Sequence, residues 1–209
     1  MLEITNPEIN AELLDLIEAA DLDVNQQARV ELELRKDIHI LTSNQRLETI
    51  AQDFVNHYSE LWTTGKAMFV CVNKTTAVRM YNLAMTYWGQ KIAELEQELE
   101  HVSQQEYLEL SRKLEWMKAT EMAVVISQEQ NETTMFEKWG LDITPHRSKM
   151  EKRELDKEFK APDNPFRIVF VCAMWLTGFD VQSLANIYLD KPLKAHSLMQ
   201  TIARANRVF

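Results

Sequence analysis

Four short apolar runs, separated by segments with helical periodicity, are the feature that most constrains the fold of this chain. Residues 66–72, 122–126 and 167–172 are almost continuously apolar, and residues 186–189 form a shorter run. Such runs are typical of strands that are buried on both faces of a sheet. Because helical segments separate them, the strands are expected to form β-α-β units. We therefore predict an α/β fold in which a parallel sheet is flanked by helices.

The helical segments are recognised by apolar residues three and four positions apart. Residues 8–20, 25–40 and 44–62 are predicted to form three helices ahead of the first strand, with Ser43 as the N-cap of the third. Further helices are expected at residues 75–88, 147–160 and 196–208, with a short one within 128–140.

Residues 91–118 carry seven glutamates against four basic residues, which predicts an exposed, acidic helical insertion or hairpin. This segment fits either a solvated surface elaboration or a docking site for another subunit. The chain is divided here into a helical lead-in, residues 1–62, and a main domain, residues 63–209, with the insertion at about 90–120. It ends directly after a predicted helix, so we expect it to be a piece of a larger protein.

The composition excludes several classes of protein. The hydrophobic fraction of 45% and the charged fraction of 26% are ordinary for a globular domain. No apolar run approaches the roughly 20 residues that a membrane helix needs. Cys71 and Cys172 lie inside apolar runs, so we expect buried, reduced thiols and a cytoplasmic location. No Cys/His cluster has metal-ligand spacing, and no metal site is predicted.

The four glycines exclude a complete phosphate-binding loop, because no two of them lie closer than 24 residues. The dipeptide Asp-Glu is absent, so the magnesium-binding box of ATP-driven motors is missing too. A nuclease pattern of Pro-Asp followed by Asp or Glu, one residue and Lys is also absent. We therefore expect no ATP hydrolysis and no DNA cleavage by the isolated chain.

Ligands of parallel sheets bind beyond the carboxyl ends of the strands, so the candidate site residues are those that follow each predicted strand. They are Asn73 and Lys74, Ser127, Thr177 to Asp180, and Asp190 with Lys191.

Two of the C-terminal motifs have both a functional and a structural interpretation. In residues 177–180, a hydroxyl and a carboxylate flank Gly178 and could contact phosphate and ribose, but a simple turn fits as well. Gln200, Arg204 and Arg207 share one helix face and suit a polyanion such as a triphosphate, although paired surface arginines would look the same. Residues 162–209 carry a net charge of +2, whereas the other 161 residues sum to −11.

Taken in order, these C-terminal motifs resemble the second motor domain, a RecA-like domain, of superfamily 2 helicases and translocases. Residues 177–180 look like motif V, and residues 200–207 look like motif VI with Ala203 in place of its usual glycine. Residues 66–74 are similar to motif IV, and Ser127 takes the place of the serine between motifs IV and V.

The resemblance is closer to one family, the R (restriction and motor) subunit of type I restriction–modification enzymes, in which the alanine of motif VI is usual. It covers about residues 45–209 and is strongest from residue 144 onward. The segments that carry it are residues 65–68, 145–147, 174–180, 188–193 and 199–209.

This resemblance implies a parent protein that couples ATP hydrolysis to translocation along double-stranded DNA and cuts DNA with a nuclease domain. Its partners would be a first motor domain and a nuclease domain in the same polypeptide, and methyltransferase and specificity subunits. It would need ATP and Mg²⁺, with the Mg²⁺ ligands outside this chain. The implied catalytic residues are Arg204 and Arg207. The implied ATP contacts are Gly178, Asp180 and Gln200. The implied DNA contacts are Asn73, Lys74, Ser127 and Thr177.

Two alternatives stay open at this point. The chain could belong to another superfamily 2 translocase or remodeller, or it could be a non-catalytic scaffold that keeps the motor fold with inert arginines. A phosphate loop and a nuclease domain upstream in the reading frame would favour the restriction enzyme over both.

Overall fold

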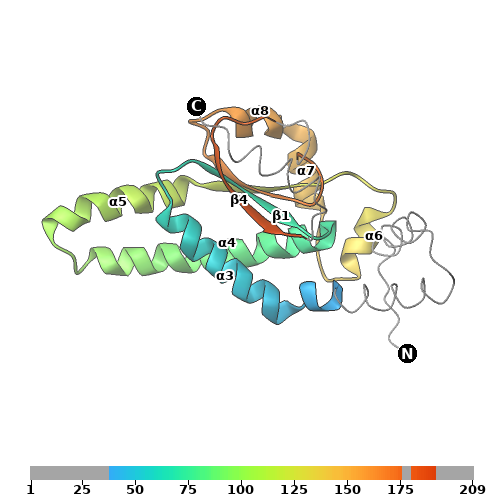
Figure 1. Ribbon diagram of the computed structural model, residues 1–209, viewed down its shortest axis with the longest axis horizontal. Coiled ribbons are helices and arrows are strands. Elements are labelled where there is room, and N and C mark those ends of the chain that lie inside the picture. Colours follow the sequence, from blue (N-terminus) through green and yellow to red (C-terminus); the bar gives the residue numbers. More distant parts are fainter. Residues whose placement is uncertain (1–37, 176–179, 192–209) are drawn as a thin grey trace. The chain divides into compact units, whose positions relative to one another are not determined.

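The computed structural model describes residues 38–175 and 180–191 (Figure 1). The chain divides into two compact units, residues 1–47 and 48–209. In the first unit, the described residues form a helical turn and the beginning of α3 (Asn44–Glu60). The second unit holds the rest of α3 and the sheet. The helices predicted at 8–20 and 196–208, and most of that at 25–40, lie outside the described residues.

Among the described residues, four strands form one sheet in the order β2-β3-β1-β4, and their three pairings are all parallel. The strands are β1 (Lys66–Cys71), β2 (Glu121–Val125), β3 (Phe166–Val171) and β4 (Leu184–Asp190). Each lies within two residues of a predicted apolar run. The prediction of an α/β fold with a parallel sheet flanked by helices is therefore confirmed.

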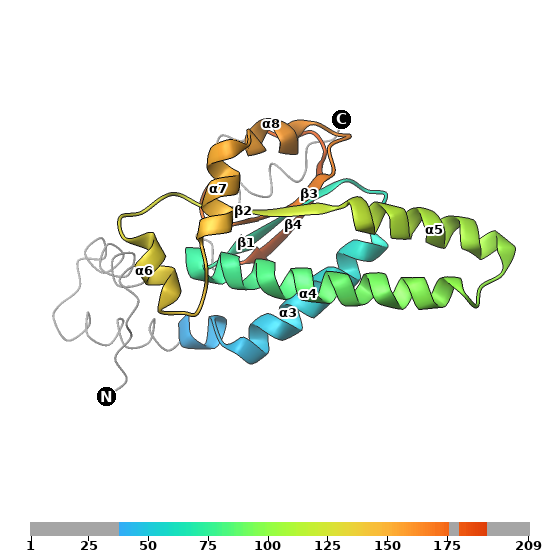
Figure 2. The ribbon, with the colours of Figure 1, turned by 180° about the vertical axis from the view of Figure 1, so that it is seen from behind.

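Two groups of helices connect these strands. α4 (Lys74–Leu99) and α5 (Gln104–Ala119) lead from β1 to β2. α6 (Glu132–Glu137), α7 (Thr144–Lys152) and α8 (Leu155–Lys160) lead from β2 to β3. Figures 1 and 2 show α3 and α4 on one face of the sheet and α8 on the other. Within the described ranges, no helix combines the length and apolar character that crossing a bilayer requires.

An aromatic row anchors α3 to the sheet. Phe69, Phe170 and Tyr188 lie at the same register on three neighbouring strands. The ring of Phe54 meets all three edge-on, with centroids 5.2, 5.9 and 4.7 Å away, respectively. Edge-to-face aromatic contacts of this kind contribute beyond their buried area. The odd-numbered residues of β1 therefore face α3 and α4.

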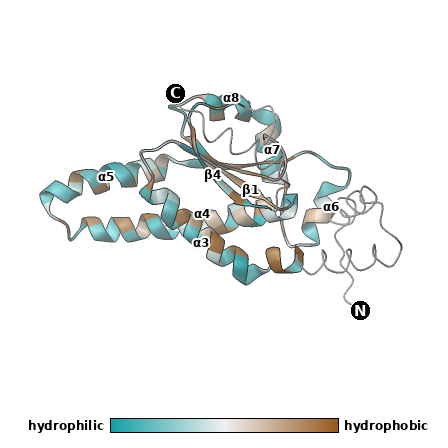
Figure 3. Ribbon diagram, viewed as in Figure 1, coloured by the Kyte–Doolittle hydropathy of each residue, from teal (hydrophilic) through white to brown (hydrophobic). Residues whose placement is uncertain are grey.

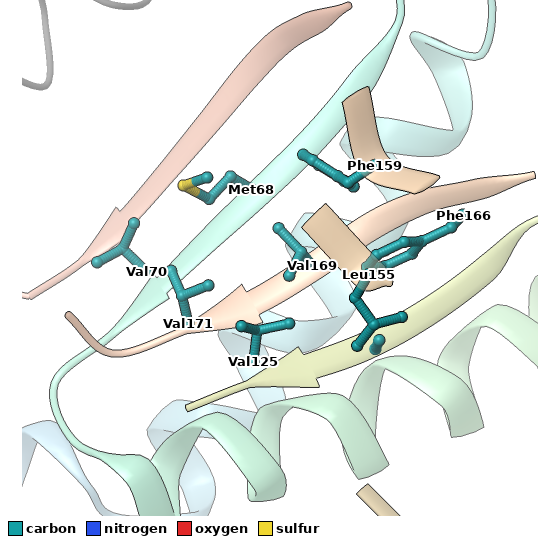
Figure 4. Close-up of a cluster of buried hydrophobic side chains, with 9 residues drawn as sticks. Met68, Val70, Val125, Leu155, Phe159, Phe166, Val169 and Val171 are labelled. Atoms are coloured by element: carbon teal, nitrogen blue, oxygen red, sulfur yellow. The ribbon is translucent and has the colours of Figure 1, made fainter. Parts of the chain in front are cut away.

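The even-numbered residues of β1 face the opposite way, toward α8. Figure 4 shows Leu155 and Phe159 of this short helix lying over Val169 and the neighbouring strands. The full cluster of buried residues on this face is Met68, Val70, Ala123, Val125, Leu155, Phe159, Phe166, Val169 and Val171. Burial of both faces explains why the strands read as apolar runs rather than as alternating patterns.

The acidic segment forms a helical hairpin, as the sequence predicts. α4 runs without a break from the sheet into the hairpin, and α5 returns antiparallel to it. The indole of Trp88 donates to the carbonyl of Met117 at 3.0 Å, and Lys118 pairs with Glu96 at 2.6 Å. Figure 3 shows that hydrophilic residues predominate on α5.

The single helix predicted at 147–160 is wrong, because α7 ends at Lys152 and α8 begins at Leu155. Arg153 between them has an extended backbone, with φ −120° and ψ 146°. Its guanidinium binds Glu121 at 2.8 Å and Glu158 at 3.0 Å. The break turns the chain, so that α7 lies beside β2 while α8 covers the sheet.

Lys66 ties the end of α8 to the first residue of β1. Its Nζ donates to the carbonyls of Ala161 at 2.7 Å and Glu158 at 3.2 Å, and lies 5.3 Å from the ring centroid of Phe159. A cation is favoured at a helix C-terminus, where carbonyl groups point outward. The side chain is nevertheless buried, and burial lowers the pKa of Lys66 from 10.5 to about 8.

Replacing Phe159 with alanine should lower the free energy of unfolding by about 3–5 kcal/mol, because it opens a cavity under the sheet. Urea denaturation of the wild-type and Phe159→Ala chains measures this difference. The exposed Tyr107 of α5 provides the matched control, and Tyr107→Ala should change the free energy by less than about 0.5 kcal/mol. Equal losses in both variants would contradict the assignment of α8 to the core.

The buried lysine predicts a pH dependence of stability. Between pH 8 and 10.5 the unfolded chain holds a proton on Lys66 that the folded chain has released, so this residue contributes increasing stability as pH rises. The free energy of unfolding of the wild type, minus that of Lys66→Met, should therefore increase from pH 7 to 9.5. Parallel curves for the two proteins would show that Lys66 titrates normally.

Candidate functional site

The four strands end at one edge of the sheet. Cys71 of β1 is level with Asp190 of β4, and Val125 of β2 is level with Val171 of β3. The residues that follow these positions therefore share a surface, which is called here the carboxyl edge. Asn73, Lys74 and Ser127 lie at this edge, together with Asp190 and Lys191.

Asn73 begins α4 and is largely buried, with 6% of its surface exposed. Its backbone is extended, and its Oδ1 accepts a hydrogen bond from the backbone N–H of Thr76 at 2.8 Å. Asparagine is among the preferred residues at this position, because its side chain satisfies a free N–H of the first turn. The positive end of the helix dipole of α4 is thereby fixed at the carboxyl edge.

The first turn of α4 also contains two buried hydroxyl groups. The Oγ1 atoms of Thr75 and Thr76 have no hydrogen-bond partner within the part of the chain that the structure describes. Buried polar atoms normally have hydrogen-bond partners, and the described residues provide none for these two hydroxyls.

Lys74 is engaged in an ion pair with Glu129, which lies in the segment after β2. The two side chains are 12% and 36% exposed, respectively. A phosphate that binds Lys74 would have to compete with this carboxylate. Neighbouring Ser127 is exposed and leaves its side chain at the surface.

Arg147 of α7 organises the segment that contains Ser127 and Glu129. Its guanidinium makes two hydrogen bonds to Glu132, Nε to Oε1 at 2.8 Å and Nη2 to Oε2 at 2.7 Å. It also donates to the carbonyls of Ile126 at 3.3 Å and Ser127 at 3.4 Å. The carboxylate of Glu132 accepts from the backbone N–H of Glu129 at 3.4 Å.

The side chain of Arg147 is 14% exposed and that of Glu132 is 10% exposed, so the ion pair is shielded from water. Removing either residue would leave the charge of the other without a partner. Sequence reasoning gave neither residue a role. The signal that could have found Arg147 was its place in the family-like segment 145–147.

The two cysteines lie at the same edge, where both are buried and are not joined in a disulfide. Burial raises the pKa of the Cys71 thiol, and the nearby Asp190 and Cys172 raise it further. A thiol held protonated in this way is a poor nucleophile and a poor metal ligand. Across residues 38–175 and 180–191, no three side chains of the metal-binding types gather at one place.

The predicted site residues Thr177, Gly178, Gln200, Arg204 and Arg207 lie outside the described residues. Asp180 is described and exposed. Trp175, just before this gap, has a φ of 67°, a conformation that bulky residues rarely adopt. The centroid of its ring lies 5.7 Å from that of Phe159, so Trp175 packs against the core on the α8 face.

The family model of type I restriction enzyme subunit R, domain 3, matches residues 63–209. The chain belongs to this family. The resemblance in the C-terminal motifs is therefore confirmed at the level of the R subunit, and the parallel sheet agrees with a RecA-like domain.

Curated relatives of this R-subunit domain come from bacteria and archaea. The HindI endonuclease subunit of Haemophilus influenzae is 32% identical over 192 residues, which is 91% of this chain and 16% of the relative. The MjaIXP endonuclease subunit of Methanocaldococcus jannaschii is 31% identical over 211 residues, covering all of this chain and 17% of the relative. The chain thus spans about one sixth of the length of these relatives.

The ion pair of this R-subunit domain predicts strong coupling between Arg147 and Glu132. Either single alanine substitution leaves a shielded charge without its partner, which typically costs about 3–5 kcal/mol. The double variant should be less destabilised than the sum of the two, with a coupling free energy of about 1–3 kcal/mol in a denaturation cycle. The exposed pair of Lys157 and Glu154 is the control and should couple by less than about 1 kcal/mol. Additive single effects at Arg147 and Glu132 would contradict the model of a shared anchor.

Proposed function

We propose that this chain is the second motor domain of a type I restriction enzyme R subunit. In this role it completes an ATP site with arginines and grips double-stranded DNA during the ATP-driven translocation that precedes cleavage. The observation that carries the proposal is the family match over residues 63–209, which includes the motif VI segment. A parallel sheet with its polar residues at the carboxyl edge supports it.

At the ATP site, Arg204 and Arg207 act as the catalytic residues on the γ-phosphate of ATP bound by the first motor domain. Guanidinium groups suit this task because they stay charged and donate paired hydrogen bonds to phosphate oxygens. Gly178, Asp180 and Gln200 contact the nucleotide. Mg²⁺ is held by residues outside this chain.

On DNA, Asn73, Lys74, Ser127 and Thr177 contact backbone phosphates, which gives grip without sequence information. The capped N-terminus of α4 supports this assignment, since free N–H groups and the helix dipole favour a phosphate there. Lys74 forms an ion pair with Glu129, so its binding to DNA requires that a phosphate replace this carboxylate.

The relatives named as endonuclease subunits support a parent protein with a nuclease domain and a first motor domain in the same polypeptide. Methyltransferase and specificity subunits are the further partners, and the cytoplasm is the compartment. The isolated chain hydrolyses no ATP, since its sequence has no phosphate loop and no Asp-Glu box.

The proposal predicts that Arg204→Ala and Arg207→Ala each lower DNA-stimulated ATP hydrolysis by a hundredfold or more, while nucleotide binding is largely retained. Arginines that stabilise the charge of the transferring phosphoryl group are worth about 10³–10⁵ in rate. The measurement uses the intact parent protein with its partner subunits. Arg112, an exposed arginine of α5, is the matched control, and Arg112→Ala should leave the rate unchanged.

Unchanged hydrolysis in both motif VI variants would remove the arginine assignment and favour a scaffold that keeps the motor fold. Loss of hydrolysis in a parent protein that never cuts DNA would instead favour another superfamily 2 translocase or remodeller.

A further inference from the structure

A groove between α4 and α7 has no part in the proposed function so far. It has a volume of about 730 Å³, and one of its walls, α7, lies beside β2, an edge strand of the described sheet. Tyr81 and Asn82 of α4 line one side, and Ser148, Lys149 and Lys152 of α7 line the other.

α7 holds its side of the groove in a fixed position. Arg147 attaches one end of the helix to the carbonyls that follow β2, as described above. Near the middle, Nζ of Lys149 donates to the carbonyl of Met122 at 3.0 Å. At the other end, Arg153 binds Glu121 at the start of β2. α7 therefore runs antiparallel to β2, and these contacts fix the positions of its cationic residues without a ligand.

The charge of the groove is positive. Lys149 is half-buried and bonded to a neutral carbonyl, and Lys152 is exposed and forms no ion pair with any described residue. The carboxylates that balance Arg153 do not line the groove, and one acidic residue, Asp142, does. Burial lowers the pKa of Lys149, the nearby carboxylates of Glu121 and Glu158 raise it, and the charge of Arg153 lowers it, so Lys149 is only partly balanced by its neighbours.

The other lining groups are neutral donors and an aromatic wall. Ser148 contributes a hydroxyl and Asn82 an amide. His146 packs edge-on against Tyr81, with ring centroids 4.7 Å apart, and burial lowers the pKa of His146. Two ammonium groups with neutral donors suit a phosphodiester, which carries a single negative charge and accepts hydrogen bonds.

We propose that the groove between α4 and α7 binds a phosphodiester of the DNA backbone through Lys149, Lys152 and Ser148. The site extends the DNA surface from the carboxyl edge along the flank of β2, and it rests on the proposed function. Each phosphate that a lysine neutralises releases condensed counterions, so the contact should appear in the salt dependence of binding.

The test compares the full-length parent protein with its Lys149→Gln/Lys152→Gln and Lys152→Gln variants on a short duplex of non-specific sequence. The double variant should bind about 3- to 30-fold more weakly, and the slope of log K against log salt should fall by about 1–2. Lys118→Gln, which removes an exposed lysine from the acidic hairpin, should change neither. Wild-type slopes in both groove variants, with normal thermal unfolding, would overturn the proposal.

A second measurement does not depend on affinity. Ser148→Cys, labelled with a photoactivatable group in the parent protein, should crosslink to the duplex, and inorganic phosphate at matched ionic strength should not prevent it. Ser127→Cys tests the carboxyl edge in the same way. Crosslinking at Ser127 alone overturns the groove and retains the proposed function, whereas no crosslinking at either position removes both. Protection of Ser148 by inorganic phosphate would identify a site for a free anion and overturn the DNA contact.

Discussion

The central strands β1 and β3 must be covered on both faces, and most of the described fold follows from that requirement. Each has neighbours on both sides within the described sheet, so neither has a free edge, and the residues of both strands are almost all buried. α3 and α4 cover one face through the aromatic row, and the two residues Leu155 and Phe159 of α8 cover much of the other. A six-residue helix can do this only if it is held in place, because isolated short helices are unstable in water.

Three cations provide that hold. Lys66 binds the carbonyl groups at the end of α8, Arg153 joins the break between α7 and α8 to β2, and Arg147 attaches α7 to the segment after β2. Lys66 is buried and the Arg147 side chain is 14% exposed, whereas the Arg153 side chain is 31% exposed; each cation binds carbonyls or carboxylates. Hydrogen bonds to charged groups are stronger than neutral ones, and losing one partner leaves the other charge buried. The region between β2 and β3 is therefore positioned by electrostatics as much as by apolar packing.

Apolar patterning predicted the strands and the parallel sheet, because burial on two faces leaves a signal in adjacent residues, and the run of glutamates predicted the acidic hairpin. The break after Lys152 was missed for a different reason. Residues 147–160 have helical composition throughout, and at the break Arg153 binds both Glu158 and Glu121, a residue 32 positions earlier. Local periodicity carries no information about such a partner.

In the candidate site, too, some features could be predicted from local sequence and others depend on distant contacts. The position of Asn73 after a buried strand was predictable, since strand ends are visible in the sequence, and so was its place at the carboxyl edge. The pairing of Lys74 with Glu129 was not, because it joins the first residue of α4 to the segment after β2 through charges that both residues could have kept in solvent. The same holds for the anchor made by Arg147 and Glu132.

The distribution of charge restricts where DNA can approach this domain. The chain carries a net charge of −9, and residues 94–109 at the far end of the hairpin contain six exposed glutamates and no lysine or arginine. A duplex there would meet repulsion. The hydroxyls of Thr75 and Thr76, which have no partner among the described residues, and the cations of α7 lie away from this end, at the carboxyl edge and on the flank of β2. Under the proposed function, a duplex would therefore approach the described part of the domain from the side of α4 and α7 rather than along the acidic hairpin.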